Sequence, residues 1–270
     1  MKIGIIGTEN SHTEHFLKTL NAEKAVPDAR VAFLFGDDDP EKAGKLAALF
    51  GAECCESADE LIEKSDAVAI TYRRGSRHPE PAMKVIRAGK PLFNDKPFAA
   101  SLSDAAKIVA LAEEKGVPVT GGSNLKGLPE LPEIRSEIKE GSVITISFAA
   151  DPASEYDGYW FYGIHSAELC LTLCGPDFTS VEAWRNGDAV TAAVAYPDKT
   201  CLILNTPSSA DLRIAVTNGG TTRARLVPLN YQSVGPKEFC DMIRTGNMPR
   251  DPRHFVRAAE LTEEIIKRLV

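Results

Sequence analysis

The sequence predicts an α/β protein with two domains: a doubly wound parallel sheet, followed by an α+β domain with a mostly antiparallel open sheet. In residues 1–122, short apolar runs without polar alternation are separated by helical patterns, which is typical of a parallel sheet covered on both faces. After Gly121 and Gly122, several strands follow one another with turn signals between them. A length of 270 residues and a hydrophobic fraction of 43% are sufficient for two cores. We therefore expect one domain at residues 1–122 and a second at residues 123–270.

The first domain is expected to alternate strands with helices. Gly7 ends the first apolar run, and an acidic turn with Pro40 closes the second, where proline suits the first turn of a helix. The predicted strands are residues 2–7, 31–35, 67–71, 91–93 and 117–120, and the predicted helices are residues 15–20, 41–50, 57–64, 80–88 and 102–115.

The second domain is expected to be richer in strands. An aromatic stretch at residues 156–162 precedes a helix that contains His165. The predicted helices are residues 131–140, 165–173, 236–245 and 252–269, and the predicted strands are residues 143–149, 180–185, 189–195, 201–205, 212–217 and 223–229.

Charge and hydropathy exclude some kinds of partner. Lys and Arg total 31 against 38 Asp and Glu, a net charge of −7 with no basic block, so nucleic acid is not an expected partner. No run approaches the roughly 20 apolar residues of a membrane span, and the first residues do not resemble a signal peptide. We expect a cytoplasmic protein without membrane contact.

The six cysteines show no Cys-x-x-Cys pair, so reduced thiols are expected. Cys170 and Cys174 lie four residues apart on one face of the predicted helix, and His165 precedes them. Buried cysteines at helical spacing usually pack rather than bind metal. We therefore predict no metal site.

The loop after the first strand lies where a Rossmann domain binds pyrophosphate, because a helix N-terminus offers free N–H groups there. Gly7 is the first glycine of the Gly-x-Gly-x-x-Gly pattern, but Glu9 and His12 replace the other two. Gly7, Thr8, Asn10 and His12 are the predicted cofactor contacts of this loop. A generic strand-to-helix turn remains the alternative.

Asp37 follows the second predicted strand, thirty residues after Gly7. A carboxylate at this position accepts hydrogen bonds from the adenosine ribose and repels a 2′-phosphate, so NAD is favoured over NADP. The alternative is that Asp37, Asp38 and Asp39 form only a solvated turn and a helix cap.

The segment from Ala88 to Pro97 places Lys96 between an aspartate and a proline, just past a strand end, where open α/β sheets bind ligands. With the upstream run that begins at His78, this segment resembles the Gfo/Idh/MocA oxidoreductases, whose signature here is an acidic residue, Lys and Pro. The resemblance covers nearly the whole chain, including Asp37, Asn124 and the region of His165.

The resemblance implies an NAD(P)-binding Rossmann domain and oxidation or reduction of a carbinol of a sugar, cyclitol or related molecule. Lys96 is then expected to contact the substrate hydroxyl and the nicotinamide end, and His165 to accept the hydroxyl proton. Arg73 and His78 join the predicted cofactor contacts. The resemblance also implies a homo-oligomer, because family members pair through the outer face of the second sheet.

One departure from the family pattern concerns the surroundings of His165, the expected proton acceptor. Family members commonly carry an aspartate four residues before this histidine, and here Phe161 takes that position. Glu168, three residues after His165 on the same helical face, is the predicted substitute, while Asp157 and Tyr162 are alternatives. The predicted catalytic residues are Lys96, His165 and Glu168.

Two other hypotheses remain open. The protein is alternatively a regulatory protein that senses a dinucleotide or another ligand without hydride transfer, since Glu9, His12 and Phe161 all depart from the catalytic pattern. A metal-dependent hydrolase or lyase that uses Glu9, His12 and His15 is the third hypothesis.

Overall fold

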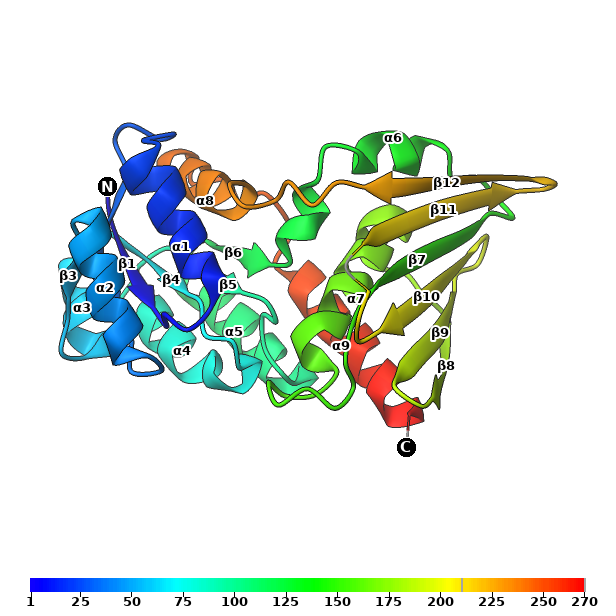
Figure 1. Ribbon diagram of the computed structural model, residues 1–270, viewed down its shortest axis with the longest axis horizontal. Helices are drawn as coiled ribbons and strands as arrows, with labels where there is room; N and C mark the ends of the chain where they lie inside the picture. Colours follow the sequence, from blue (N-terminus) through cyan, green and yellow to red (C-terminus); the bar gives the residue numbers. More distant parts are fainter. Residues whose placement is uncertain (210, 270) are drawn as a thin grey trace. The chain divides into compact units, whose positions relative to one another are not determined.

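The computed structural model describes residues 1–209 and 211–269. The chain forms two compact units. The first comprises Met1–Asn124 and Tyr231–Arg253, and the second comprises Leu125–Asn230 and the chain from His254 onward. Figure 1 shows the elements of both units.

The first unit contains a parallel sheet of six strands in the order β3-β2-β1-β4-β5-β6. All five neighbouring pairs are parallel, and this is the doubly wound order in which the connections reverse direction between β1 and β4. The predicted doubly wound fold is confirmed. The strands are β1 Lys2–Ile6, β2 Arg30–Phe35, β3 Glu53–Cys54, β4 Ala67–Ile70, β5 Leu92–Asp95 and β6 Val119–Gly122. The two-residue edge strand β3 was not predicted.

The helices of this unit begin at residues that cap them. Asn10, Asp39, Ser57 and Ser101 each accept a hydrogen bond from an early backbone N–H of the helix that follows. These helices are α1 Ser11–Leu17, α2 Pro40–Phe50, α3 Ala58–Lys64 and α5 Leu102–Lys115, together with α4 Pro79–Arg87. Helix α1 starts four residues before the predicted position, because the cap by Asn10 makes its polar first turn helical.

Helix α8, Val234–Thr245, also belongs to the first unit. Its Phe239 is fully buried in the same core as Phe16 and Phe93, with ring centroids 5.8 Å from Phe93 and 6.4 Å from Phe16. The expectation that everything after residue 122 forms the second domain is therefore corrected for residues 231–253. The apolar stripe of this helix indicated burial, but the sequence pattern does not indicate which core it joins.

The second unit contains a mixed sheet in the order β12-β11-β7-β10-β9-β8. Only the β7–β10 pair is parallel, so the predicted mostly antiparallel sheet is confirmed. The strands are β7 Val143–Ala149, β8 Ser180–Asn186, β9 Ala189–Ala195, β10 Thr200–Thr206, β11 Leu212–Asn218 and β12 Thr221–Val227.

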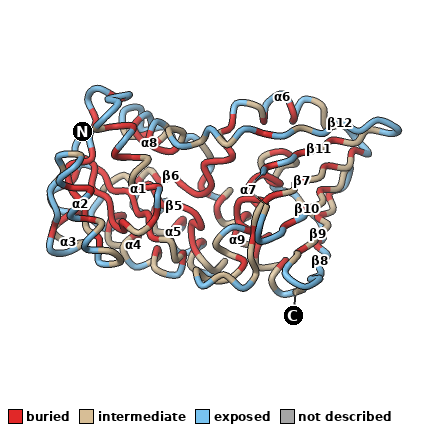
Figure 2. Tube along the Cα trace, viewed as in Figure 1, coloured by how far each residue is buried: buried red, intermediate tan, exposed pale blue. Residues whose placement is uncertain are grey.

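Helix α7, Trp160–Cys174, packs on β7 and β10. Burial alternates along these strands, and the residues of one face, such as Ile146 and Ile203, are fully buried. Figure 2 shows the burial of the elements of both units. Helices α6 Leu131–Ser136 and α9 Arg253–Arg268 complete the unit. Helix α7 begins five residues before the predicted start, because the aromatic stretch forms its first turn. Helix α6 ends earlier than predicted.

In the part of the chain that the structure describes, no helix is long and apolar enough to cross a membrane.

Candidate functional site

The loop between β1 and α1 is held by a carboxylate from the end of β2. Gly7 has φ +92°, and a Cβ there would lie 2.7 Å from the Tyr72 nitrogen, so this position requires glycine. The Thr8 amide donates to Asp38 Oδ1 and Oδ2 at 2.9 and 3.0 Å, and the Glu9 amide donates to Oδ2 at 3.0 Å. Asp38 therefore occupies two amides of a loop that binds an anion in Rossmann domains.

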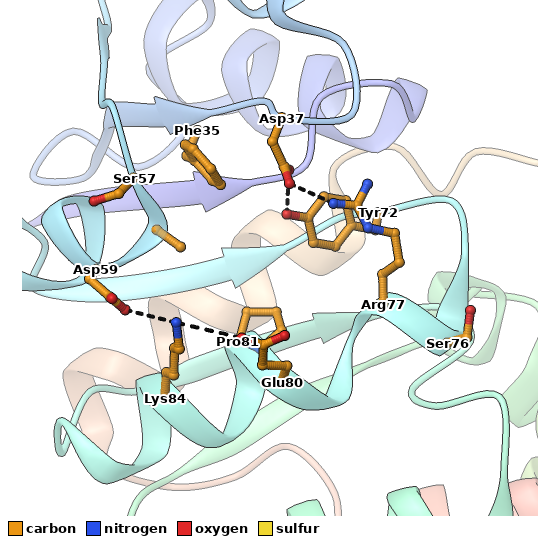
Figure 3. Close-up of a pocket in the computed structure, with 11 residues that line it drawn as sticks. Phe35, Asp37, Ser57, Asp59, Tyr72, Ser76, Arg77, Glu80, Pro81 and Lys84 are labelled. Atoms are coloured by element: carbon orange, nitrogen blue, oxygen red, sulfur yellow. Dashed lines mark hydrogen bonds and ion pairs between the residues drawn. The ribbon is translucent and has the colours of Figure 1, made fainter.

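Asp37 lies beside this loop and is bound by two side chains. Tyr72 Oη donates to Asp37 Oδ1 and Arg77 Nη2 donates to Oδ2, each at 2.6 Å. The Arg77 guanidinium stacks 4.0 Å from the centre of the Tyr72 ring (Figure 3). Burial, together with the bond to Asp37, raises the pKa of Tyr72, so its hydroxyl stays protonated and donates. Asp37 is thus the acceptor of a charge-assisted pair.

These residues line a pocket of about 430 Å³ in the first unit. Phe35, Asp37 and Tyr72 line it beside the ends of β2 and β4, and Lys84 lies at its α4 side, 3.2 Å from Asp59 (Figure 3). The pocket combines apolar surface, three carboxylates and two cationic side chains. Such a lining suits a ligand with an aromatic ring and hydroxyl groups.

The remaining predicted cofactor residues lie nearby in the first unit. His78 is buried, and its Nε2 lies 2.9 Å from the Tyr72 carbonyl oxygen, so it supports the backbone beside Tyr72. Arg73 Nη1 lies 3.9 Å from Glu9 Oε1, so the Glu9 carboxylate faces a cationic side chain. The structure therefore brings the predicted residues together at the carboxyl ends of the strands.

A second polar group is buried at the carboxyl end of β5. Asp95 is fully buried, and its Oδ2 accepts from His12 Nδ1 at 2.6 Å and from Asn10 Nδ2 at 3.2 Å. Burial favours the protonated form of Asp95, but His12 and then Lys96 outweigh it and lower its pKa. Asp95 is therefore a carboxylate with histidine, asparagine and lysine around it.

Lys96 is 3% exposed. Burial lowers its pKa to about 8, Asp95 opposes this shift, and Arg73 adds to it. A lysine with such a pKa exchanges protons close to physiological pH.

His12 stands where the third glycine is expected, and its side chain makes the contact with Asp95. Its ring also lies 5.2 Å from that of His15, and Tyr231 packs edge-on against both. Burial and the neighbouring His12 lower the pKa of His15 to about 4, so His15 is neutral at pH 7. The Asp95–His12 pair was missed, because the sequence shows a lost glycine but not the carboxylate that its replacement reaches.

The ligand atoms of Glu9, His12 and His15, the third hypothesis, are not among those that converge on one point in the described part of the chain. Among the described residues, the ligand atoms that converge on one point are the three sulfurs of Cys170, Cys174 and Cys201. His12 Nδ1 is directed at Asp95, and Glu9 lies toward Arg73.

His165 lies in the second unit on α7, and it is buried. Its ring centroid is 5.7 Å from that of Phe148 and 5.4 Å from that of Tyr162. Phe161 packs against Tyr156 and Tyr162. An aromatic cluster thus surrounds His165 in place of the carboxylate that the family resemblance implied.

Glu168, one turn further along α7, is fully buried between a lysine and a histidine side chain. Lys126 Nζ lies 3.3 Å and His254 Nε2 lies 3.5 Å from Glu168 Oε2. Lys126 is also buried, with its ammonium 5.5 Å from the centre of the Phe255 ring. Breaking a buried pair of this kind is costly, since it leaves a charge without compensation. The sequence named Glu168 but not these partners, which are far away along the chain.

Comparisons with known proteins agree with this architecture. Residues 1–123 match the family model GFO_IDH_MocA, described as an oxidoreductase family with an NAD-binding Rossmann fold. The chain is 26% identical over 211 residues to an inositol 2-dehydrogenase of Ralstonia nicotianae, covering 74% of this chain and 59% of that one. It is 25% identical over 232 residues to inositol 2-dehydrogenase 2 of Saccharopolyspora erythraea, covering 81% and 68%. The chain thus spans about three fifths of the Ralstonia enzyme's length.

Solved structures share the fold of both units. UDP-N-acetylglucosamine 3-dehydrogenase GnnA from Acidithiobacillus ferrooxidans superposes with a TM-score of 0.80 at 18% identity, covering 100% of this chain and 97% of that one. GenD2 from gentamicin A biosynthesis, solved in complex with NAD, gives a TM-score of 0.83 at 15% identity, covering 99% and 93%. Residues 1–123 therefore match the NAD-binding Rossmann domain of the Gfo/Idh/MocA oxidoreductase family, and both units share the fold of these solved structures.

Proposed function

We propose that this protein is an NAD-dependent oxidoreductase that transfers hydride between nicotinamide and a carbinol of a sugar, a cyclitol or a related small molecule. The observation that carries the proposal is Lys96, a buried lysine with a pKa of about 8 beside a buried carboxylate at the end of β5. The carboxyl ends of parallel strands are where open α/β sheets bind their ligands. The inositol 2-dehydrogenases matched by the sequence support the substrate class.

The adenosine half of NAD fits the pocket at Asp37. Its volume of about 430 Å³ is within the usual range for ligand sites, and Asp37 ends β2 where the ribose hydroxyls need an acceptor. The carboxylate disfavours a 2′-phosphate, so NAD remains preferred to NADP. Arg77, bound to Asp37, would have to leave that carboxylate for the ribose to bind there.

The pyrophosphate half requires a local rearrangement. Asp38 accepts the amide protons of Thr8 and Glu9, and a carboxylate next to a phosphate is repelled by it. We infer that binding of the dinucleotide displaces the Asp38 carboxylate from these amides. Helix α1, which begins at Ser11, supplies further N–H groups at its N-terminus.

Lys96 and His165 are the proposed catalytic residues. NAD, when bound, supplies the carbon that accepts the hydride. The Lys96 ammonium donates a hydrogen bond to the substrate oxygen and stabilises the negative charge that develops there. His165 takes the hydroxyl proton, since imidazole exchanges protons near neutral pH. Glu168 is a proposed positioning residue, which fixes α7 through Lys126 and His254.

Replacement of Lys96 by methionine tests the proposal. We expect Lys96→Met to lower kcat/KM by a factor of about 10³ or more, since it removes the charge that faces the substrate oxygen. The measurement is NADH formation with a panel of cyclitols and sugars, and NADH oxidation with the corresponding ketones. Lys107→Met, on the exposed side of α5, is the matched control and is expected to keep full activity. Full activity of Lys96→Met would contradict the assignment.

A second candidate is a regulatory protein that binds the dinucleotide without turnover. Asp38 on the loop amides and the aromatic cluster around Phe161 favour it. Calorimetric titration with NADH and NADPH separates the candidates when combined with the substrate panel. Micromolar binding of NADH without oxidation by any ketone would support the sensor, and turnover would exclude it.

We also propose that the protein pairs with a second copy through the outer face of the second sheet. Strand registers align Leu226, Arg213, Ser147, Leu204, Thr191 and Trp184 in one row across all six strands. Leu226, Leu204 and Trp184 are exposed large hydrophobic side chains. Three large exposed hydrophobic side chains in a row that also carries polar residues support association through this sheet face. A cytoplasmic location remains a prediction.

A further inference from the structure

Three cysteine sulfurs meet in the core of the second unit. Cys170 and Cys174 lie one turn apart on α7, and Cys201 lies on the face of β10 against which α7 packs. Their sulfur atoms are all within 4.8 Å of one another. The sequence paired Cys170 and Cys174 with His165, and the structure brings Cys201 to them instead.

The three cysteines of the cluster differ in burial. Cys170 and Cys201 are 0% exposed, whereas Cys174, at the end of α7, is partly exposed. Cys174 therefore offers a route by which an ion or a reagent reaches the sulfurs. The other two sulfurs are shielded from solvent, and thus from competing ligands.

A tyrosine hydroxyl lies close to the cluster, and a lysine ammonium lies close to the tyrosine ring. The Tyr196 hydroxyl donates its proton to the Gly175 carbonyl at 3.0 Å, so at its 3.4 Å contact with Cys170 Sγ the thiol is the donor. The ammonium of Lys199 lies 5.5 Å from the Tyr196 ring centre and brings positive charge to this end of the unit. The thiolate is the form of cysteine that binds metals.

We propose that Cys170, Cys174 and Cys201 form a binding site for a thiophilic metal ion, with zinc as the natural candidate. Thiolates 2.3 Å from a tetrahedral zinc stand about 3.8 Å apart, so the sulfurs need to approach one another by at most about 1 Å. The thiols that coordinate lose their protons to solvent, and no electron is transferred. A water molecule entering beside Cys174 completes the fourth position. The site is independent of Lys96 and of the proposed hydride transfer.

Cadmium is a suitable probe, because thiolate-to-cadmium charge transfer absorbs in the ultraviolet. Titration of the reduced full-length protein is expected to saturate at one ion per chain. Cys201→Ser should weaken this binding on the order of 100-fold, because it removes one of three ligands. Cys54→Ser and Cys240→Ser are the matched controls, since neither residue belongs to the cluster, and both are expected to bind as the unmodified protein does.

A measurement on the unmodified protein avoids any folding defect of the variants. Alkylation mapped by mass spectrometry, with and without saturating zinc, follows Cys174 and the exposed Cys54 in one sample. Zinc is expected to slow alkylation of Cys174 at least tenfold and to leave Cys54 unchanged. Equal alkylation of Cys174 with and without zinc, or undiminished cadmium binding by a folded Cys201→Ser protein, would overturn the site.

Discussion

At the scale of single residues, the buried group at the end of β5 concentrates the chemistry of the first unit. Asp95 raises the pKa of Lys96 against the effect of burial, and His12 and Asn10 fix the carboxylate by hydrogen bonds. His12 occupies a position where the family pattern has glycine. A residue that appears as a defect in the nucleotide loop is therefore part of the environment of the proposed catalytic lysine.

The pKa of Lys96 predicts a pH dependence. If the ammonium stabilises the developing oxyanion, kcat/KM falls as pH rises through about 8, because the lysine loses its proton there. Asp95→Asn removes the charge that raises this pKa, so the fall is expected at lower pH. Asp188→Asn, at an exposed pair with Arg185, is the control and should leave the profile unchanged. A profile of Asp95→Asn identical to that of the unmodified protein would contradict this coupling.

The lowered pKa of Lys96 also makes the free energy of unfolding depend on pH. Because the pKa of folded Lys96 is lowered from 10.5 to about 8, the unfolded chain binds more protons between these values. The contribution of Lys96 to the free energy of unfolding therefore rises with pH across this window. Below pH 8 the lysine is charged in both states, and the cost of burying its charge is fully present.

At the scale of elements, α8 shows how a distant segment completes a core. Phe239 and Met242 of α8 are buried, and Phe239 contacts the rings of Phe16 and Phe93. Its burial couples the stability of the Rossmann domain to residues that follow the second sheet in sequence. Residues 1–124 alone would expose this apolar surface.

Truncation of Phe239 tests this role. Phe239→Ala is expected to lower the free energy of unfolding by about 3–5 kcal/mol, since it leaves a cavity in a closed core. Denaturant unfolding followed by circular dichroism gives the difference. Lys237→Ala, an exposed position on the same helix, is expected to change it by less than about 0.5 kcal/mol. A loss for Phe239→Ala no larger than that of the control would contradict the assignment of α8 to the core.

At the scale of the whole molecule, the second sheet has one face covered by α7 and another that carries three exposed large hydrophobic side chains in one row. Leu204 lies near the middle of this row, on β10, with Trp184 and Leu226 on the two edge strands. A second copy of the chain would bury all three side chains. The proposed dimer would thus explain the large apolar groups on an otherwise exposed surface.

A charge in this row is expected to separate the copies. Leu204→Glu places like charges in the interface and should shift the protein from dimer to monomer in sedimentation experiments at micromolar concentration. Lys107→Glu, on α5 of the first unit, is the control and should remain dimeric. If the unmodified protein sediments as a monomer at all concentrations, the proposed pairing is wrong.

The sequence by itself determined the fold class and the positions of most elements, because these depend on local patterns. The non-alternating strands, the capping residues and Gly7 indicated the doubly wound domain, and the Asp-Lys-Pro segment located Lys96 at a strand end. These signals lie within a few residues of one another along the chain. Helices α1 and α7 begin earlier in the structure than the sequence predicted. A helix cap and a run of aromatic residues are weaker signals of a helix start than apolar periodicity is.

Only the tertiary structure decided which side chains meet. Asp38 on the loop amides, His12 against Asp95, Glu168 between Lys126 and His254, and Cys201 beside Cys170 and Cys174 all join residues from different elements. Helix α8 likewise packs in the core of the first unit, although it follows the second sheet in the sequence. Such contacts depend on how strands and helices are ordered and packed in space, and a single sequence carries no local signal for that order.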